Sequence, residues 1–225
     1  MNQTRPLFFV LALTGFALHG CVSQPASTEV AQVAAPTPLM QAAAEGDTKA
    51  VRRLIKQGES VNAVAPQGTA LTEAAQAGQK DMVLLLLQEG ADPNLGRAES
   101  GSSALHQAAA AGDVQSIRVL VAAGAKLDQR DTADLTPIAY AVRNGSLPAT
   151  KALIAAGADV NVVMQGKSLL MHVVAQGSLL MAQVLIQAGA DVNYQAASGE
   201  TALTLARDRR QEDLEMLLLQ SGARS

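Results

Sequence analysis

A motif of fixed internal spacing recurs six times between Thr37 and the end of the chain. Every copy opens with a threonine or serine, and a glycine follows 21 residues later. All variation in length falls between a closing glycine and the next opening residue, so consecutive copies start 32 to 34 residues apart. A fixed part followed by a variable part is typical of packed helices joined by exposed connections. The sequence therefore predicts a repeat protein whose units stack side by side.

Residue types at fixed positions predict two helices in each copy. The opening threonine or serine can accept a hydrogen bond from the free amides of a first helix, and Pro38 or Pro137 suits its first turn. A glycine near the middle of five copies ends that helix, and Arg210 stands there in the sixth. A second, apolar helix then runs to the closing glycine. The predicted helix caps are Thr37, Thr69, Ser103, Thr136, Ser168 and Thr201.

This pattern resembles the ankyrin repeat. The resemblance implies an all-α solenoid of about six helix-turn-helix units with hairpin-like loops, over residues 37–225. Only Ser103-Ala-Leu-His106 retains the histidine that is typical of the family. We therefore expect a weaker hydrogen-bond network between the other repeats. The implied units are about 37–68, 69–102, 103–135, 136–167, 168–200 and 201–225.

Residues 1–20 resemble a bacterial lipoprotein signal peptide. Arg5 precedes an apolar run of 13 residues, 6–18, which is too short to span a bilayer comfortably. The run ends in Leu18-His-Gly-Cys21, which resembles a lipobox, and His19 departs from the small or apolar residue usual there. The resemblance implies cleavage before Cys21, acylation of Cys21 (as with palmitate) and a place at the periplasmic face of the outer membrane. An ordinary secretory signal or an uncleaved anchor is the alternative.

The segment 21–36 is predicted to be a flexible tether, because it is small, polar and interrupted by prolines. Cys21 is the only cysteine, so no internal disulfide is expected. The chain from Cys21 onward has a net charge of 16 − 20 = −4, because Arg5 is lost with the signal peptide. No basic stripe is present, so no nucleic-acid partner is expected.

Residues that could carry catalysis are scarce. No His-x-x-x-His, Cys-x-x-Cys or Gly-x-Ser-x-Gly motif occurs. Gly166-Lys-Ser168 lacks a phosphate loop's first glycine, because residue 161 is Asn. We expect His106 to bond at a repeat junction and His172 to be partly buried. We therefore predict no enzyme activity, no cofactor, no metal and no small-molecule substrate.

In ankyrin proteins the partner docks on the loop tips and on the inner face of the first helices. Interface hot spots favour tyrosine and arginine, so Arg97, Arg130, Arg143 and Tyr194 are the principal candidates here. For each residue, the alternative is an ordinary solvated side chain. Tyr140 is expected to pack between repeats instead. Carried over by register, the partner-binding positions are Arg97, Arg130, Asp131, Asp134, Arg143, Asn144, Lys167, Tyr194 and Glu200.

The resemblances together imply a monomeric, non-catalytic module that is anchored by lipid and binds a periplasmic protein. Some exported bacterial ankyrin proteins have a similar layout and support a periplasmic catalase in peroxide defence. Other lipoproteins of repeat architecture are immunity proteins that block toxins delivered into the periplasm. An alternative of another class is a structural scaffold associated with peptidoglycan. The sequence does not choose among these partners, because an ankyrin surface is a general interface.

Overall fold

The computed structural model describes residues 31–224. In that range the chain forms six helical hairpins, and each hairpin has an inner (odd-numbered) and an outer (even-numbered) helix. The inner helices are α1 (Pro38–Glu45), α3 (Ala70–Gln76), α5 (Ala104–Ala111), α7 (Pro137–Arg143), α9 (Leu169–Gln176) and α11 (Ala202–Asp208). The outer helices are α2 (Thr48–Lys56), α4 (Lys80–Gln88), α6 (Val114–Ala122), α8 (Leu147–Ala156), α10 (Leu179–Gln187) and α12 (Glu212–Gln220).

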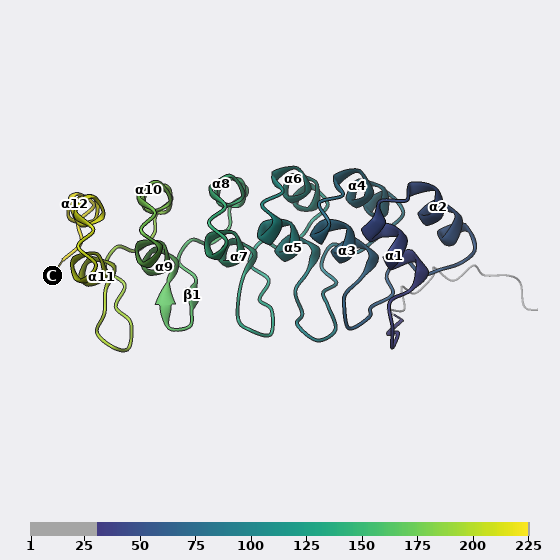
Figure 1. The fold of residues 1–225 in the computed structure, drawn as a ribbon, viewed down its shortest axis with the longest axis horizontal. Coiled ribbons are helices and arrows are strands. Elements are labelled where there is room, and N and C mark those ends of the chain that lie inside the picture. Colours follow the sequence, from purple (N-terminus) through teal and green to yellow (C-terminus); the bar gives the residue numbers. More distant parts are fainter. Residues whose placement is uncertain (1–30, 225) are drawn as a thin grey trace, which may run out of the picture.

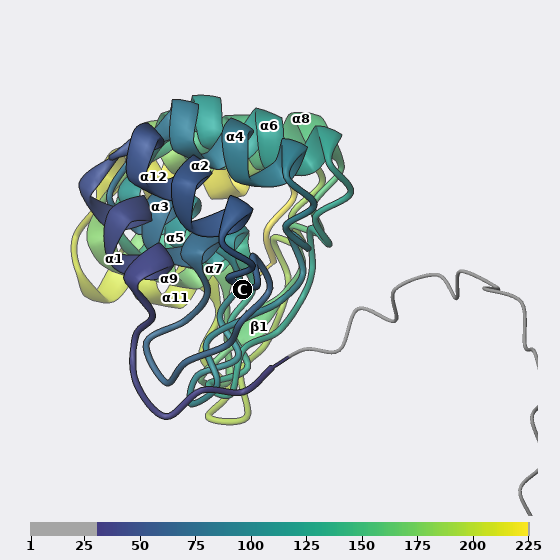
Figure 2. The same cartoon turned by 90° about the vertical axis from the view of Figure 1, so that its right-hand side faces the viewer.

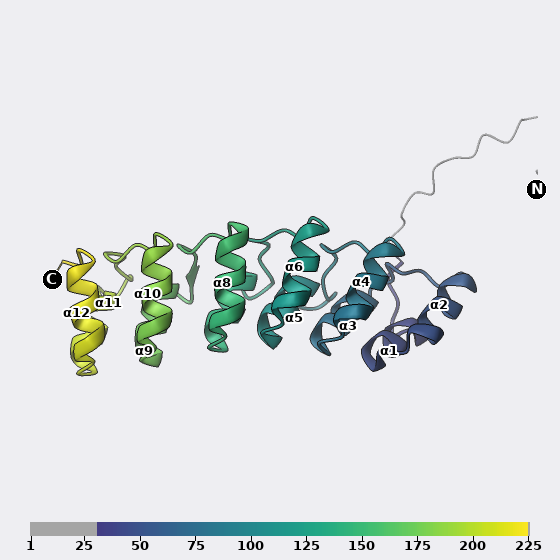
Figure 3. The ribbon, with the colours of Figure 1, turned by 90° about the horizontal axis from the view of Figure 1, so that it is seen from above.

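The hairpins stack side by side in chain order (Figure 1). Seen along the stack, the outer helices form one row, the inner helices a second row, and the loops project away from both (Figure 2). From above, the outer helices lie next to one another along the whole length (Figure 3). This architecture confirms the predicted all-α solenoid of about six units. No helix within residues 31–224 is long and apolar enough to cross a membrane.

One loop contains a short sheet. Strands β1 (Val163–Met164) and β2 (Lys167–Ser168) pair antiparallel, with Val163 opposite Ser168. The two residues between them, Gln165 and Gly166, both have positive φ, of 53° and 77°. Such a pair matches the twist of a two-residue hairpin. The hairpin-like loop implied by the resemblance is thus a regular hairpin in this unit.

The start of the described chain lies against the first loop. The Val33 amide donates to the Val64 carbonyl, and the Val64 amide donates to the Ala31 carbonyl, both over 2.9 Å. These bonds attach the end of the segment expected to be a tether (21–36). The predicted signal peptide and Cys21 lie outside the described residues.

The predicted caps behave differently from one unit to the next. Thr37, Thr69, Ser168 and Thr201 accept hydrogen bonds from the amides three residues ahead. Ser103 instead bonds His106 Nδ1 over 2.9 Å. The buried Thr136 hydroxyl has no partner in the described structure, which departs from the prediction that it caps its helix. The third helical residue of this unit, Ala139, has no polar side chain and therefore cannot bond back to the Thr136 amide.

Two rows of aliphatic side chains, leucine in all but one position, hold the stack together. The first lies two residues after each opening threonine or serine, and every member is at most 1% exposed. The second lies four residues before each closing glycine and is fully buried from the second unit onward. Burying each side chain contributes about 1.5–3 kcal/mol. The first row is Leu39, Leu71, Leu105, Ile138, Leu170 and Leu203; the second is Leu54, Leu86, Leu120, Leu153, Leu185 and Leu218.

A row of amide side chains joins consecutive loops. The residue four positions after a closing glycine donates from Nδ2 to the next closing glycine's carbonyl, over 3.1 to 3.2 Å. Its Oδ1 accepts from the backbone amide of the residue two positions after that same glycine, over 2.8 to 2.9 Å. Asp128 makes only the second bond, because a carboxylate cannot donate. The four complete members are Asn62, Asn94, Asn161 and Asn193.

Candidate partner-binding surface

The inner helices and the loops together form one face of the molecule, called the inner face below (Figure 2). The predicted partner-binding residues lie on this face or at its edge. Arg97 belongs to the loop between α4 and α5, and Arg130 to the loop between α6 and α7. Arg143 ends α7, and Tyr194 lies in the loop between α10 and α11. The structure divides these residues into three groups with different surroundings.

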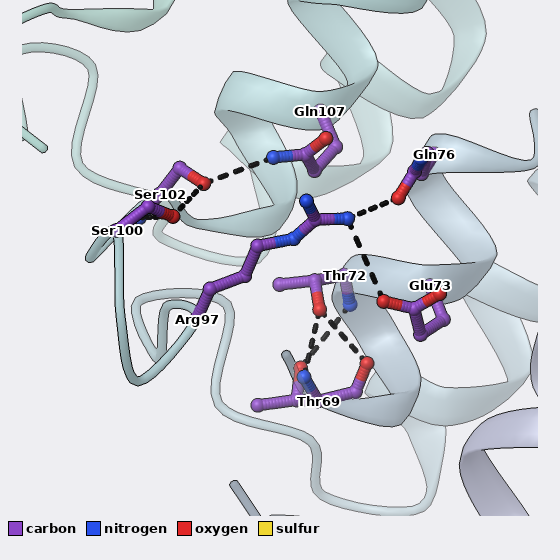
Figure 4. A network of polar contacts seen from close by, with 8 residues as sticks. All are labelled: Thr69, Thr72, Glu73, Gln76, Arg97, Ser100, Ser102 and Gln107. Carbon is purple, nitrogen blue, oxygen red and sulfur yellow. Dashed lines mark hydrogen bonds and ion pairs between the residues drawn. The ribbon is translucent and has the colours of Figure 1, made fainter. Parts of the chain in front are cut away.

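The first group surrounds Arg97 and is called the open cluster: Glu73, Gln76 and Arg97 (Figure 4). Arg97 Nη2 donates to Gln76 Oε1 and lies 3.6 Å from Glu73 Oε1. Glu73 Oε1 and Arg97 Nε are buried and have no hydrogen-bond partner among the described residues. Burial raises the pKa of the Glu73 carboxyl, and the Arg97 guanidinium opposes part of that rise. The open cluster therefore has hydrogen-bonding capacity that the described structure does not use.

The open cluster lines a depression of about 460 Å³. A second depression, of about 280 Å³, adjoins it toward the first unit, and Gln67 and Glu73 line both. The wall of the second depression is mostly apolar, from Pro36, Met40 and Ala44. The remaining lining residues of the first are Pro66, Gln76, Arg97, Glu99 and Ser100.

Gly68 allows the backbone to approach the open cluster. Its φ is 140°, and a Cβ added there would lie 2.0 Å from Thr72 Oγ1 and 3.2 Å from Arg97 Cγ. A side chain at this position would therefore displace both neighbours. The absent side chain lets Arg97 lie over the start of α3.

The second group is called the closed cluster: His106, Asp131, Tyr140 and Arg143. Asp131 is only 9% exposed and accepts from three donors. These are the amides of Ala133 and Leu135 at 2.9 Å and the Tyr140 hydroxyl at 2.6 Å. The short side chain of Asp131, a predicted partner-binding residue, therefore turns back toward its own loop and Tyr140.

Tyr140 is the centre of the closed cluster. Burial and the hydrogen bond to Asp131 raise the pKa of Tyr140 to about 12, while Arg143 and Arg97 both oppose the rise. The Arg143 guanidinium lies 4.7 Å from the centre of the Tyr140 ring, a cation–π contact. The predicted residue Arg143 is thus in direct contact with this tyrosine. As expected, Tyr140 packs between repeats.

His106 links the closed cluster to the backbone. Its Nδ1 accepts from the Ser103 amide over 3.0 Å, and its Nε2 donates to the Leu135 carbonyl over 3.1 Å. Its ring meets the Tyr140 ring edge-on, with centres 5.4 Å apart. Burial lowers the pKa of His106, which favours the neutral ring that this accept-and-donate pattern needs. In the equivalent position the Thr72 hydroxyl makes only local bonds, accepting from the Thr69 amide and donating to the Thr69 carbonyl, so its unit lacks the longer link.

The third group consists of residues that pair with each other at loop tips. Arg130 and Asp134 form an ion pair over 2.9 Å, and Lys167 and Glu200 form another over 2.5 Å between neighbouring loops. Tyr194 donates to the Gly166 carbonyl over 3.4 Å. Exposed pairs of this kind contribute about 0–1 kcal/mol and leave the groups accessible.

Asn144 makes a hydrogen bond to another repeat that its position in the sequence did not predict. Its Nδ2 donates to the Ala110 carbonyl of the preceding unit over 2.8 Å. Gln176 and Arg209 reach back to the preceding inner helix in the same way. The side chain of Asn144 is thus committed to a neighbouring unit, although it stays exposed.

Sequence reasoning did not select Glu73. The signal was its place four residues after the opening Thr69, in register with Tyr140, which lies four residues after Thr136. His172 was expected to be partly buried, and its Nε2 bonds the Met164 carbonyl over 3.0 Å. Among residues 31–224, no three His, Cys, Asp or Glu side chains converge as metal ligands would.

Comparison with known proteins identifies the repeats. The family described as ankyrin repeats (3 copies) matches residues 16–97 and 93–164, and the family described as ankyrin repeat matches residues 165–197. The chain is 33% identical over 121 residues to cyclin-dependent kinase 4 inhibitor B of Rattus norvegicus, covering 54% of this chain and 93% of that relative. It is 30% identical over 138 residues to the E3 ubiquitin-protein ligase KEG of Arabidopsis thaliana, covering 56% of this chain. That match spans only 8% of the ligase.

Solved structures agree with the same assignment. The ankyrin repeat domain of Bcl-3 superposes with a TM-score of 0.77 and 32% identity, over 86% of this chain and 89% of that domain. An ankyrin repeat domain from Acinetobacter baumannii gives a TM-score of 0.76 and 30% identity, over 83% of this chain and 98% of that one.

Proposed function

The chain belongs to the ankyrin repeat family, and on that premise we propose that it is a non-catalytic module that binds a protein partner through its inner face. Proteins of this family generally serve as interaction modules. The observation that carries the proposal is the open cluster. Buried polar groups are normally satisfied within a protein, so unused capacity beside two depressions favours a surface that a partner completes.

The charge and aromatic pattern supports the same face. Arg143 contacts the Tyr140 ring there, and Arg97 lies in the loop between α4 and α5; these residue types dominate binding energy at protein interfaces. The relative named as a cyclin-dependent kinase 4 inhibitor is, by its name, a protein that acts on another protein. By analogy this supports a macromolecular partner for the present chain.

We also propose that the module is held at a membrane by an acyl group on Cys21, with its stack in the periplasm. The support is the sequence Leu18-His-Gly-Cys21 behind a short apolar run. Cells expressing the full chain should incorporate labelled palmitate into it, and Cys21→Ser should abolish the label and release the chain from the outer-membrane fraction. Equal labelling of the Cys21→Ser chain would refute the anchor.

The biological role is proposed on resemblance alone: support of a periplasmic catalase in peroxide defence. A deletion strain should then be sensitive to peroxide and indifferent to competing bacteria. The reverse phenotype would indicate immunity to a delivered toxin. Tight binding to purified peptidoglycan, with no protein partner, would indicate an envelope scaffold.

Crosslinking in intact cells tests the binding proposal. The full chain with a C-terminal tag is compared with Arg97→Ala/Arg143→Ala. A matched control, Arg118→Ala/Lys151→Ala, removes the same charge from exposed positions on outer helices α6 and α8. One partner that is lost in the first variant and retained in the control supports the proposal. A partner retained by both moves the site away from the inner face, and repeated absence of any partner refutes the binding function.

A further inference from the structure

The ionisable groups that face the first depression carry more negative than positive charge. Glu99 is exposed and makes no hydrogen bond or ion pair among the described residues. Glu73 has only the long contact with Arg97, and its Oε2 accepts no hydrogen bond. Arg97 is the one cation among the lining residues and already donates to Gln76. Two carboxylates therefore face one guanidinium, and the depression has an unbalanced negative charge.

The second depression adds an apolar site beside that charge. Glu73 and Gln67 form the wall between the two depressions, so any group bound at Glu73 lies next to the surface of Met40, Ala44 and Pro36. Lysine and arginine combine an apolar stem with a charged end. A segment with such a residue next to an aliphatic one would match both depressions at once.

The chain's own N-terminal segment does not meet this requirement. Residues 31–33 pair with the first loop, and Pro36, which follows them, lines the apolar depression. The preceding residues 22–30, Val-Ser-Gln-Pro-Ala-Ser-Thr-Glu-Val, contain one acid and no base. Charge complementarity therefore assigns the site to a partner and not to this tether.

Resting on the proposed function, we infer that the inner face of the first three units recognises a basic side chain of the partner, seated between Glu73 and Glu99, with a neighbouring aliphatic side chain in the depression beside Met40. The cation would supply a donor to Glu73 Oε2 and balance the charge that Arg97 leaves. The aliphatic group would cover apolar surface. Both terms are needed, because an exposed ion pair alone contributes little.

A displayed library of random heptapeptides provides the test, with the full chain immobilised through a C-terminal tag in detergent. Wild type is compared with Glu73→Gln/Glu99→Gln and with a matched control, Asp81→Asn/Glu212→Gln, which removes the same charge from outer helices α4 and α12. Wild type and control should enrich peptides that have lysine or arginine next to an aliphatic residue. The Glu73→Gln/Glu99→Gln variant should bind those peptides about tenfold more weakly. Glu99→Gln alone, at an exposed position, replaces the double variant if the latter unfolds.

Three outcomes would overturn the inference: no enriched peptide, an enriched motif without a basic residue, or equal enrichment by the Glu73→Gln/Glu99→Gln variant. A motif matching a segment of this chain would assign the site to a second copy instead. If a partner still crosslinks to the wild-type inner face, these failures remove the inference and leave the binding function in place. Loss of all crosslinked partners would remove the function itself.

Discussion

Arg97 and Asp131 occupy the same position in adjacent units, seven residues after the closing glycines Gly90 and Gly124, and have opposite surroundings. Asp131 is enclosed and accepts from three donors. Arg97 makes one hydrogen bond, to the side-chain amide oxygen of Gln76, and a longer contact with the Glu73 carboxylate. Its Nε has no partner among residues 31–224.

The difference follows from the lengths of the two side chains and from the fact that one accepts hydrogen bonds whereas the other donates them. A loop has free amides within reach of a short carboxylate, so an aspartate can be satisfied by its own backbone. A guanidinium donates only and is long, so it needs acceptors on other elements. The same repeat position can therefore fix the loop in one unit and leave a surface for a partner in the next.

The largest effect is expected from Asp131→Ala in the closed cluster. It removes the acceptor of two amides and of the Tyr140 hydroxyl, so the free energy of unfolding should fall by about 3 kcal/mol. Urea denaturation measures the change. Arg130→Ala in the same loop is the control and should change stability by at most about 0.5 kcal/mol. A loss below about 1 kcal/mol for Asp131→Ala would show that the cluster is not closed in solution.

Acid should weaken the closed cluster through His106. Its folded-state pKa lies below the ordinary value of 6.5, so the neutral ring stabilises the fold. That contribution is present above pH 6.5 and is lost as pH falls through the lowered pKa. The free energy of unfolding of the wild type should therefore fall more steeply below pH 6.5 than that of His106→Gln. Identical slopes would exclude His106 as a source of the pH dependence.

The junction beside the closed cluster can be completed by Asp128→Asn. The new amide should donate to the Gly157 carbonyl, as Asn161 does to Gly189, and raise the free energy of unfolding by about 1 kcal/mol. Asn161→Asp is the reciprocal change and should lower it by a similar amount. Thermal denaturation of both variants checks the pair, and a change of the same sign in both would contradict the assignment.

The smallest effect belongs to the open cluster. Burial raises the folded-state pKa of Glu73 above its ordinary value of 4.5, so its stabilising contribution is present below pH 4.5 and is lost as pH rises through the raised pKa. Glu73→Gln should therefore slightly stabilise the chain at neutral pH. This sign is opposite to that for Asp131→Ala. Measured destabilisation at pH 7 would place Glu73 among the structural residues.

The repeats were predictable because their signals are local. Thr69 indicates the start of a helix and Gly90 the end of one, independently of the surrounding structure, and apolar positions occur at fixed intervals. The roles of Asp131 and Asn144 were not predictable in the same way. Asn144 bonds a carbonyl 34 residues earlier, and Asp131 turns inward to two amides of its own loop and to the Tyr140 hydroxyl. Register places such residues on a face, but side-chain length and direction decide whether they reach solvent.

If a force is applied to its two ends, we expect this stack to unfold one junction at a time. Each amide rung joins one loop to the next, from Asn62 to Asn193, and none reaches past a neighbouring unit. A force along the stack is therefore passed through successive junctions, and each can open and close again on its own. Between two points of attachment, the stack would therefore lengthen in steps of one junction.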